Sequence, residues 1–372
     1  MVSAVVNRKL FIRQGDIVIH ANIYACLVGE QGGRKSTPKD FARDIICQNF
    51  PDLPIAASIQ SREDIIRYMS SEDSIRTFKS NEGVIEYHPY IFYINELKNF
   101  LSINPGAMIE FLTDIYDRAY FDSRTIKRNA ELVPNPCLVI LACETPEWII
   151  DKLKLRIISG GFSRRMLYIY EIEEKDEESI RIIPRPFISP QSRAARLRVV
   201  GHLQSIENLV GEFKWTRSAT TLFDRWYTKN KLTPQTDSIM RGYSRTKDTQ
   251  LLKVCMLLAA SRPNPQLLLT GELLCEGLSL LECNEINLPK LSVAAGRNEL
   301  ALQQFQILEI IKAAGGFMTQ PEVMRAMSNE LSPMEMAATL HFMKEARMLV
   351  TSAQNGEIYL MDAEYVKRRS GQ

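Results

Sequence analysis

Apolar positions in the first 170 residues follow two alternating patterns. Nearly continuous, β-branched-rich runs, typical of buried strands, occupy 17–20 and 23–28 (taken together as one strand), 91–94, 137–143 and 166–171. Apolar residues at helical spacing separate them, at 38–46, 61–69 and 107–116. Strands that alternate with helices predict an α/β fold with a mostly parallel sheet.

The pattern changes after residue 173. A charge run at 173–178 is followed by Pro184, Pro186 and Pro190, a composition typical of a boundary and also of an exposed loop. From Ser192 to about Glu285 the spacing is helical, which predicts an all-α region. The tail predicts helices at 299–313, 320–327 and 333–346 and a hairpin around Asn355-Gly356, a winged-helix order.

These patterns divide the chain into an α/β domain at 1–185, a helical region at 186–297 and a winged-helix domain at 298–372. A length of 372 residues with 45% hydrophobic residues suits two or three packed domains. The formal net charge is only +2, so a nucleic-acid surface would have to be a local basic patch.

Cysteine usage and hydropathy indicate where in the cell the protein is expected. The seven cysteines include no CxxC pair and the four histidines are scattered, so no zinc-ligand spacing is present. The chain opens without a charged-then-apolar leader, and no apolar run approaches the roughly 20 residues that span a bilayer. We therefore expect a cytoplasmic protein with reduced thiols and no membrane association.

A glycine-rich segment joins the first strand to the first helix. Phosphate binding needs converging backbone amides, glycines that permit that backbone path, a lysine for the outer phosphates and a hydroxyl for Mg²⁺. Gly29, Gly32 and Gly33 give the path, Lys35 the charge and Ser36 the hydroxyl, and Thr37 adds a second hydroxyl. The segment predicts a P-loop that binds ATP with Mg²⁺.

One residue departs from the common pattern G-x-x-x-x-G-K-[ST]. Arg34 stands where that pattern has glycine. A glycine-rich turn before a helix also occurs without any ligand. The strand before Gly29 and the helix after Thr37 favour the nucleotide-binding interpretation.

The strand 91–94 ends at Asn95-Glu96. An ATPase needs a carboxylate at the end of a neighbouring strand, to activate water or to hold the Mg²⁺ shell. Glu96 is our candidate base, and Asn95, in place of the usual first acid, would contact the metal through a water. The alternative is a strand that merely ends in a glutamate.

Two further segments are candidates for the same site. Thr145 follows the strand 137–143, at the edge where open α/β sheets bind ligands, and could sense the γ-phosphate or simply cap the next turn. Arg164 and Arg165 precede the last strand. Either could be an arginine finger, in cis or toward a neighbouring subunit, or a solvated surface residue.

A basic segment between the strands 91–94 and 137–143 is our candidate for contact with single-stranded nucleic acid. Arg118, Arg124, Lys127 and Arg128 are interleaved with Tyr116, Tyr120 and Phe121, and cations track phosphates while rings stack on bases. A solvated basic hairpin is the alternative. The predicted winged helix is rich in methionine, so it could contact either DNA or protein.

Several of these motifs together resemble a family of P-loop ATPases encoded by bacteriophages, plasmids and integrated elements, often fused or adjacent to primases. The resemblance spans about His20 to Ala260. It rests on residues 20–24 before the loop and on the Arg-Lys-Ser-Thr end of the loop at residues 34–37. It rests also on residues 95–97, 135–136, 145–148 and 161–164.

The resemblance implies a RecA-like core, similar to replicative helicases that act as hexameric rings on DNA. It makes Arg34 a family variant rather than a sign of a dead site. Expected partners are single-stranded or forked DNA, a primase and further copies of the chain.

Three functions follow from these patterns. The first is an ATP-hydrolysing DNA helicase or translocase of a phage or mobile element, in which Lys35 and Ser36 hold Mg·ATP and Glu96 activates water. The second is a nucleotide-gated DNA-binding or helicase-loader protein with little hydrolysis. The third is a transcriptional regulator with a degenerate P-loop.

Overall fold

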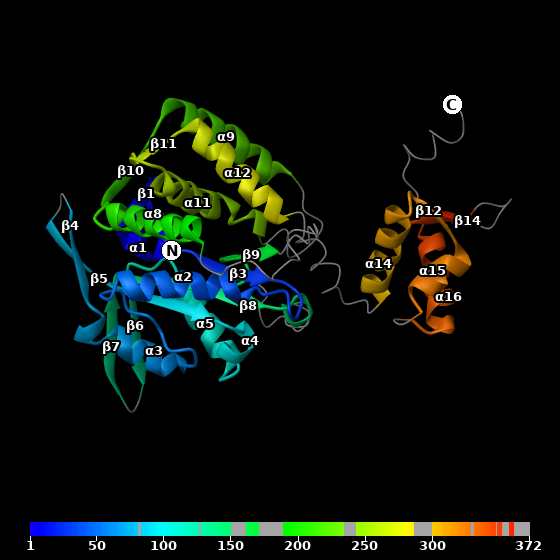
Figure 1. Cartoon of the computed structure of the whole chain (residues 1–372), viewed down its shortest axis with the longest axis horizontal. Helices are drawn as coiled ribbons and strands as arrows, with labels where there is room; N and C mark the ends of the chain where they lie inside the picture. Colours follow the sequence, from blue (N-terminus) through cyan, green and yellow to red (C-terminus); the bar gives the residue numbers. More distant parts are fainter. Residues whose placement is uncertain are drawn as a thin grey trace. The chain divides into compact units, whose positions relative to one another are not determined.

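The structure is a computed structural model that describes residues 1–80, 83–125, 128–149, 161–170, 189–233, 243–285, 300–328, 331–346, 348–351 and 357–360. It divides into two compact units, Met1–Leu288 and Pro289–Gln372. Mixed sheets and many helices make the chain an α/β protein, as the alternating pattern predicts (Figure 1).

The largest sheet of the first unit has five strands in the order β4-β5-β8-β3-β9. The strands are β4 (Arg76–Ser80), β5 (Gly83–Ile94), β8 (Pro136–Glu144), β3 (Tyr24–Val28) and β9 (Met166–Tyr170). All except β4 run parallel, and β4 pairs with β5 in the antiparallel sense. The parallel strands are mostly apolar because helices cover both faces of the sheet.

Helices from the first half of the chain cover these two faces (Figure 1). They are α2 (Ser36–Asn49), α3 (Arg62–Met69), α4 (Leu97–Phe100) and α5 (Pro105–Ile115). On one face, Ile45 and Ile46 of α2 join the core cluster of Ile91 and Val139. On the opposite face the packing involves aromatic rings, since the ring of Tyr68 in α3 stacks on the ring of Tyr90 in β5.

A second sheet has the order β11-β10-β1-β2. Its strands are β1 (Leu10–Gln14), β2 (Ile17–His20), β10 (Gly211–Trp215) and β11 (Leu268–Leu269). The helices around it are α1 (Val2–Val6), α8 (Pro190–Ile206), α9 (Arg217–Leu232), α11 (Lys247–Ser261) and α12 (Gly271–Glu285).

This sheet corrects two predictions. The region from Ser192 to Glu285 is not all-α, because β10 and β11 lie within it and β10 pairs with β1. Local periodicity misses β10 because it is short, and its partner lies near the amino terminus. The run 17–28 is not one strand either, since β2 and β3 belong to different sheets.

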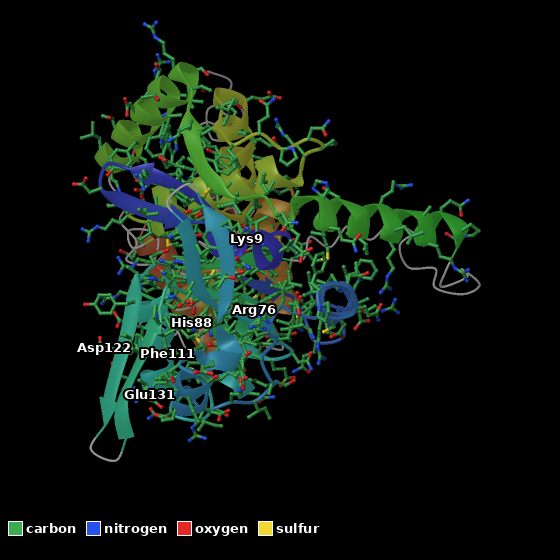
Figure 2. The ribbon with its side chains drawn as sticks, turned by 90° about the vertical axis from the view of Figure 1, so that its left-hand side faces the viewer. Lys9, Arg76, His88, Phe111, Asp122 and Glu131 are labelled. Carbon is green, nitrogen blue, oxygen red and sulfur yellow. The ribbon has the colours of Figure 1, made fainter. Side chains whose placement is uncertain are left out.

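The segment between α5 and β8 forms an antiparallel ribbon of β6 (Tyr120–Thr125) and β7 (Arg128–Pro134). The ribbon projects from the body of the first unit, with Asp122 and Glu131 on its two strands (Figure 2).

The second unit contains α14 (Leu300–Ala313), β12 (Phe317–Thr319), α15 (Gln320–Ala326), α16 (Pro333–Glu345), β13 (Leu349–Thr351) and β14 (Glu357–Leu360). The three strands form an antiparallel sheet in the order β12-β14-β13. Capping boxes start α15 and α16, since Thr319 pairs with Glu322 and Ser332 with Glu335.

Candidate phosphate-binding site

The glycine-rich loop lies between the end of β3 and the start of α2. Its entrance is fixed by Gly29, whose N–H donates to the carbonyl oxygen of Glu144 at 3.3 Å. Inside it, the Gly33 N–H donates to the Glu30 oxygen at 3.2 Å and the Thr37 N–H to the Arg34 oxygen at 2.9 Å. Helix α2 begins at Ser36 with no acidic residue in its first turn. The first N–H groups of a helix lack helical partners and attract anions.

Arg34 adopts a left-handed conformation, with φ of 55°. That conformation costs a residue with a side chain about 1–2 kcal/mol and costs glycine little. Gly32, with φ of 84°, makes a second such turn. At the position where the common motif has glycine, the backbone therefore adopts a conformation typical of glycine, although the residue is arginine.

Lys35 is partly exposed at the start of the helix. Its Nζ donates to the backbone oxygen of Glu30 at 3.0 Å, across the loop. Beside it lies a pocket of about 280 Å³ between the loop and the ends of β3 and β9, lined in part by Leu27, Pro38, Ile169 and Tyr170. Lys35 and this apolar pocket could hold the phosphates and an apolar part of one ligand.

The carboxyl ends of β3, β8 and β5 meet at this edge of the sheet. Val28 pairs with Glu144, and Ile94 pairs with Ala142, so β8 lies between the loop strand and the strand that leads to Glu96. The predicted base is therefore two strands from the loop, and the immediate neighbour of β3 ends at Glu144-Thr145. Thr145 lies next to the entrance of the loop, because the Glu144 carbonyl oxygen accepts from the Gly29 N–H.

Glu96 is about half exposed, at 47% of its side chain. Its Oε2 accepts from Asn99 Nδ2 at 2.7 Å and lies 3.4 Å from Lys98 Nζ. A carboxylate with this exposure keeps access to water, which a general base for hydrolysis requires.

Glu144 is a buried carboxylate that was not among the predicted site residues. Its Oε2 accepts from the Lys98 N–H at 2.7 Å and its Oε1 from the Thr145 N–H at 3.0 Å. Burial raises its pKa, and the two backbone hydrogen bonds oppose that rise. Glu144 ties the end of β8 to α4 and thus to the turn that carries Glu96. A glutamate at the end of an apolar strand was the available signal.

Asn95 is held by a lysine that the sequence analysis counted only as part of a helix. The Oδ1 atom of Asn95 accepts a short hydrogen bond from Lys39 Nζ. The same Nζ lies 2.5 Å from Asp40 Oδ1, and the Lys39 side chain is only 1% exposed. The amide oxygen predicted to face the metal shell is therefore bonded to an ammonium group. Lysine at the fourth position after Lys35 was the only sequence signal.

Arg164 and Arg165 lie at the other edge of the sheet. Met166 pairs with Tyr24 and Tyr170 with Val28, so β9 separates the arginines from the loop by about 13 Å of strand. Arg165 Nη1 donates to the Gly161 oxygen at 2.8 Å, and its guanidinium lies 5.8 Å from the Tyr116 ring centre. The structure does not bring these arginines to the loop of their own chain. An action toward a neighbouring subunit stays a prediction.

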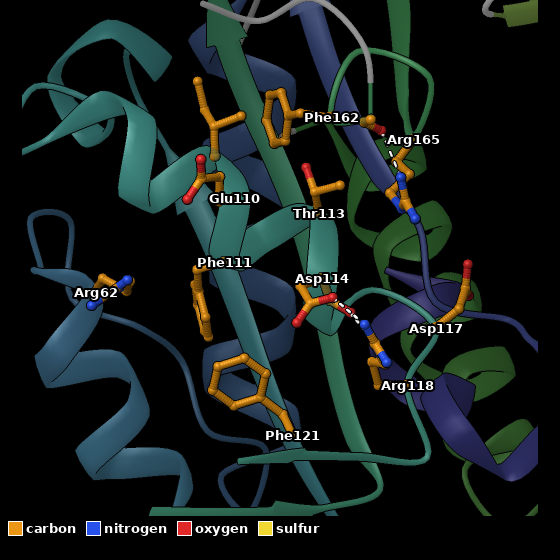
Figure 3. A pocket seen from close by; sticks show the side chains of 12 residues that line it. Arg62, Glu110, Phe111, Thr113, Asp114, Asp117, Arg118, Phe121, Phe162 and Arg165 are labelled. Atoms are coloured by element: carbon orange, nitrogen blue, oxygen red, sulfur yellow. Dashed lines mark hydrogen bonds and ion pairs between the residues drawn. The ribbon is translucent and has the colours of Figure 1, made fainter. Parts of the chain in front are cut away.

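Arg165 lines a larger pocket of about 830 Å³ along α5 (Figure 3). Among its charged side chains, Arg118 pairs with Asp114 within the lining, and Arg62 pairs with Glu63 outside it. Asp117 pairs with the buried Lys253 at 2.9 Å. The charged side chains of the lining are three arginines, Arg62, Arg118 and Arg165, and three acids, Glu110, Asp114 and Asp117, so the lining has no excess of either charge.

The candidate nucleic-acid residues lie on the β6–β7 ribbon and at its base. Arg118 is exposed, and its hydrogen bond and ion pair with Asp114 raise its pKa. Tyr120 is 62% exposed. The side chains of Arg124, Lys127 and Arg128 lie outside the described residues. The ribbon geometry fits the basic-hairpin alternative, and Asp122 and Glu131 place negative charge on the same ribbon (Figure 2).

Some motif residues gather at the amino edge of the sheet instead of the loop. Lys253 Nζ donates to the oxygens of His20 at 3.0 Å and Asn22 at 3.1 Å, to Asn22 Oδ1 at 2.8 Å and to Asp117. Arg8 donates to the Pro136 oxygen at 2.8 Å and to Asn135 Oδ1 at 3.2 Å. We call these residues, Arg8, His20, Asn22, Asn135 and Lys253, the buried polar hub.

Comparison with known proteins adds no assignment: no family model and no curated protein matches the chain. The described residues contain no group of three or more His, Cys, Asp or Glu side chains placed to hold a metal ion. No helix in the described part of the chain is long and apolar enough to cross a membrane.

Proposed function

We propose that this chain is a P-loop ATPase that remodels DNA, a helicase or translocase of a phage or mobile element that works with a primase. One observation carries the proposal. The loop Gly29–Thr37, Glu96 and Thr145 follow three parallel strands whose carboxyl ends meet at one edge of the sheet. Open α/β sheets bind ligands in the crevice at that edge.

The residues suit ATP in most respects. Lys35 and the first amides of α2 would hold the phosphates, and Ser36 would face Mg²⁺. Bound Mg²⁺ would neutralise charge on the outer phosphates. Glu96 would orient and deprotonate the attacking water, and Thr145 would contact the terminal phosphate. Asn95 fits less well, because Lys39 occupies its oxygen.

Two features support the finer fold assignment. One strand, β8, lies between the loop strand and the strand of Glu96, with β9 on the far side of the loop strand, an order expected of a RecA-like core. The second unit runs helix, strand, two helices, two strands, which is the order of a winged helix.

The DNA part of the proposal rests on the resemblance and on the β6–β7 ribbon. A projecting ribbon with exposed Tyr120 and Arg118 can reach into a strand of unpaired bases. A hexameric ring, a primase partner and forked DNA belong to the same proposal.

ATP hydrolysis with and without single-stranded DNA tests this function. We expect the DNA to raise the rate and Lys35→Ala to reduce it at least about tenfold, since the outer phosphates lose their cation. Lys214→Ala is the matched control, because Lys214 is 67% exposed on β10 and pairs with Glu212. If DNA has no effect and Lys35→Ala hydrolyses ATP like the unchanged protein, the proposal fails.

The contact between Lys39 and Asn95 favours a second candidate, a nucleotide-gated DNA-binding or loader protein with little turnover. A cation next to the metal-facing amide would weaken the arrangement that activates water. Tight ATP binding with negligible hydrolysis, and duplex binding that is lost on removal of residues beyond Glu299, would favour this candidate over the helicase.

A further inference from the structure

Lys39, the buried lysine in the first turn of α2, has no role in the function proposed so far. Lys39 lies one helical turn after Lys35 on α2, so both side chains leave the same face of the helix. Its Nζ bonds to Asn95 at the end of β5 and to Asp40, whose side chain is 54% exposed. A lysine is rarely buried at 1% exposure unless its charge is paired, as that of Lys39 is with Asp40.

Both lysines act on the same small region. Cys143 Sγ lies 3.4 Å from the Lys35 carbonyl oxygen. Burial raises the pKa of the Cys143 thiol to about 11, while the Lys39 and Lys35 ammonium groups lower it. Cys143 is the residue before Glu144 on β8, between the loop strand and the strand of Asn95. Both ammonium groups therefore lie close enough to Cys143 to oppose the effect of its burial.

The side chain that follows β5, Asn95, lacks the negative charge that a metal shell uses at this position. A carboxylate there would attract Mg²⁺ and its waters. Here the neutral Asn95 accepts from an ammonium group that is paired with Asp40, so the oxygen that would face a divalent cation is already bonded to a cation. The same positive charge attracts phosphate, together with Lys35 and Arg34.

We propose that Lys39 is a built-in cation that takes over part of the role of Mg²⁺, so that a nucleoside triphosphate binds this loop with little dependence on a divalent metal. The inference rests on the proposed nucleotide binding and adds a specificity-determining residue to it. It concerns binding alone and is independent of turnover.

Equilibrium binding of a fluorescent ATP analogue, mant-ATP, to the full chain in Mg²⁺ and in EDTA is the test. For the unchanged protein we expect the Kd to rise by about threefold or less when Mg²⁺ is removed. For Lys39→Met we expect the Kd in EDTA to rise about tenfold or more while the Kd in Mg²⁺ changes little, because the metal then supplies the missing charge. Lys214→Met, at an exposed position of β10, should bind like the unchanged protein.

Asn95→Asp is the second variant, for the case in which Lys39→Met does not fold. It keeps Lys39 and adds a carboxylate, so binding should become more dependent on Mg²⁺. An equal loss of affinity in both buffers for Lys39→Met, or Asn95→Asp with an unchanged ratio of the two Kd values, overturns the inference. Binding only in Mg²⁺ by the unchanged protein overturns this inference alone, and binding in neither buffer overturns the proposed function as well.

Discussion

The parallel strands of the five-stranded sheet begin at one edge, the amino edge, and end at the other, the carboxyl edge. Charged residues have opposite roles at these two edges. At the carboxyl edge, Lys35 is partly exposed and bonded to one backbone oxygen of its own loop. At the amino edge, Lys253 of the buried polar hub has four acceptor atoms, three on His20 and Asn22 and one on Asp117, and the ring of Tyr116 lies 4.2 Å away. Residues that carry the same family resemblance therefore lie in two different environments.

A cation whose acceptors are all supplied by the protein stabilises the fold, because its desolvation is offset only by those partners. A cation with one replaceable partner stays available to a ligand. The resemblance thus combines residues that hold the fold, such as Asn22 and Asn135, with residues suited to chemistry, such as Lys35. Lys39 lies between these cases, since it is buried but its acceptor Asn95 lies at the carboxyl edge.

The largest effect is expected at the hub, from Lys253→Met. The change leaves Asn22 and Asp117 without their cation, and we expect the free energy of unfolding to fall by about 3 kcal/mol, the low end for a broken buried pair because Asp117 is about one third exposed. Urea unfolding followed by tryptophan fluorescence measures it, since Trp148, Trp215 and Trp226 all lie in the first unit. Lys214→Met should change stability by about 0.5 kcal/mol or less. A similar small change for Lys253→Met would contradict the contrast between the edges.

Glu96→Gln and Glu144→Gln separate chemistry from support at the carboxyl edge. We expect Glu96→Gln to slow ATP hydrolysis about 100-fold or more with stability and ATP binding unchanged, because it removes an exposed base. Glu144→Gln should lower the unfolding free energy by about 1–3 kcal/mol, because an amide NH₂ would face one of the two N–H groups that Glu144 accepts from. Paired rate and unfolding measurements check this. Exchanged phenotypes would show that Glu144 is the base.

A pH dependence is expected from His20 in the hub. Burial, with Arg8 and Lys253 nearby, lowers the pKa of His20 well below 6.5, so the unfolded chain binds the proton first as pH falls. Stability from this group is complete above about pH 6.5 and declines below it, by up to about 1.4 kcal/mol per pH unit. Unfolding of His20→Asn between pH 5 and 8 should show a shallower decline. His341→Asn, at an exposed position of α16, should decline like the unchanged protein.

The smallest effects are expected from the loop backbone. Gly32→Ala forces a side chain into φ of 84° and should lower stability by about 1 kcal/mol, although no atom lies within 4 Å of the added carbon. Arg34→Gly relieves the left-handed residue and should leave stability within about 1 kcal/mol. Gly201→Ala, inside α8 and equally unobstructed, should instead raise stability slightly. Equal responses of Gly32 and Gly201 would contradict the strained loop.

Much of the first unit could be predicted from the sequence because its elements are long and strongly patterned. The helices at 61–69 and 107–116 agree with α3 and α5, and the strand 137–143 agrees with β8. The loop between β3 and α2 was also predictable, since glycines, lysine and hydroxyls follow one another directly. The short strand β10 was missed because its partner is β1, which no local pattern reveals.

The sequence by itself determined the strand, glycine loop and helix around Lys35, because those residues are contiguous and their conformation is local. Only the tertiary structure decided that β8 lies between the loop and Glu96, that Arg165 lies at the opposite edge, and that Lys39 bonds to Asn95. Each of those facts depends on the order and direction of strands in the sheet. That order is fixed by packing between segments far apart in the chain, which the spacing of residues along one segment does not encode.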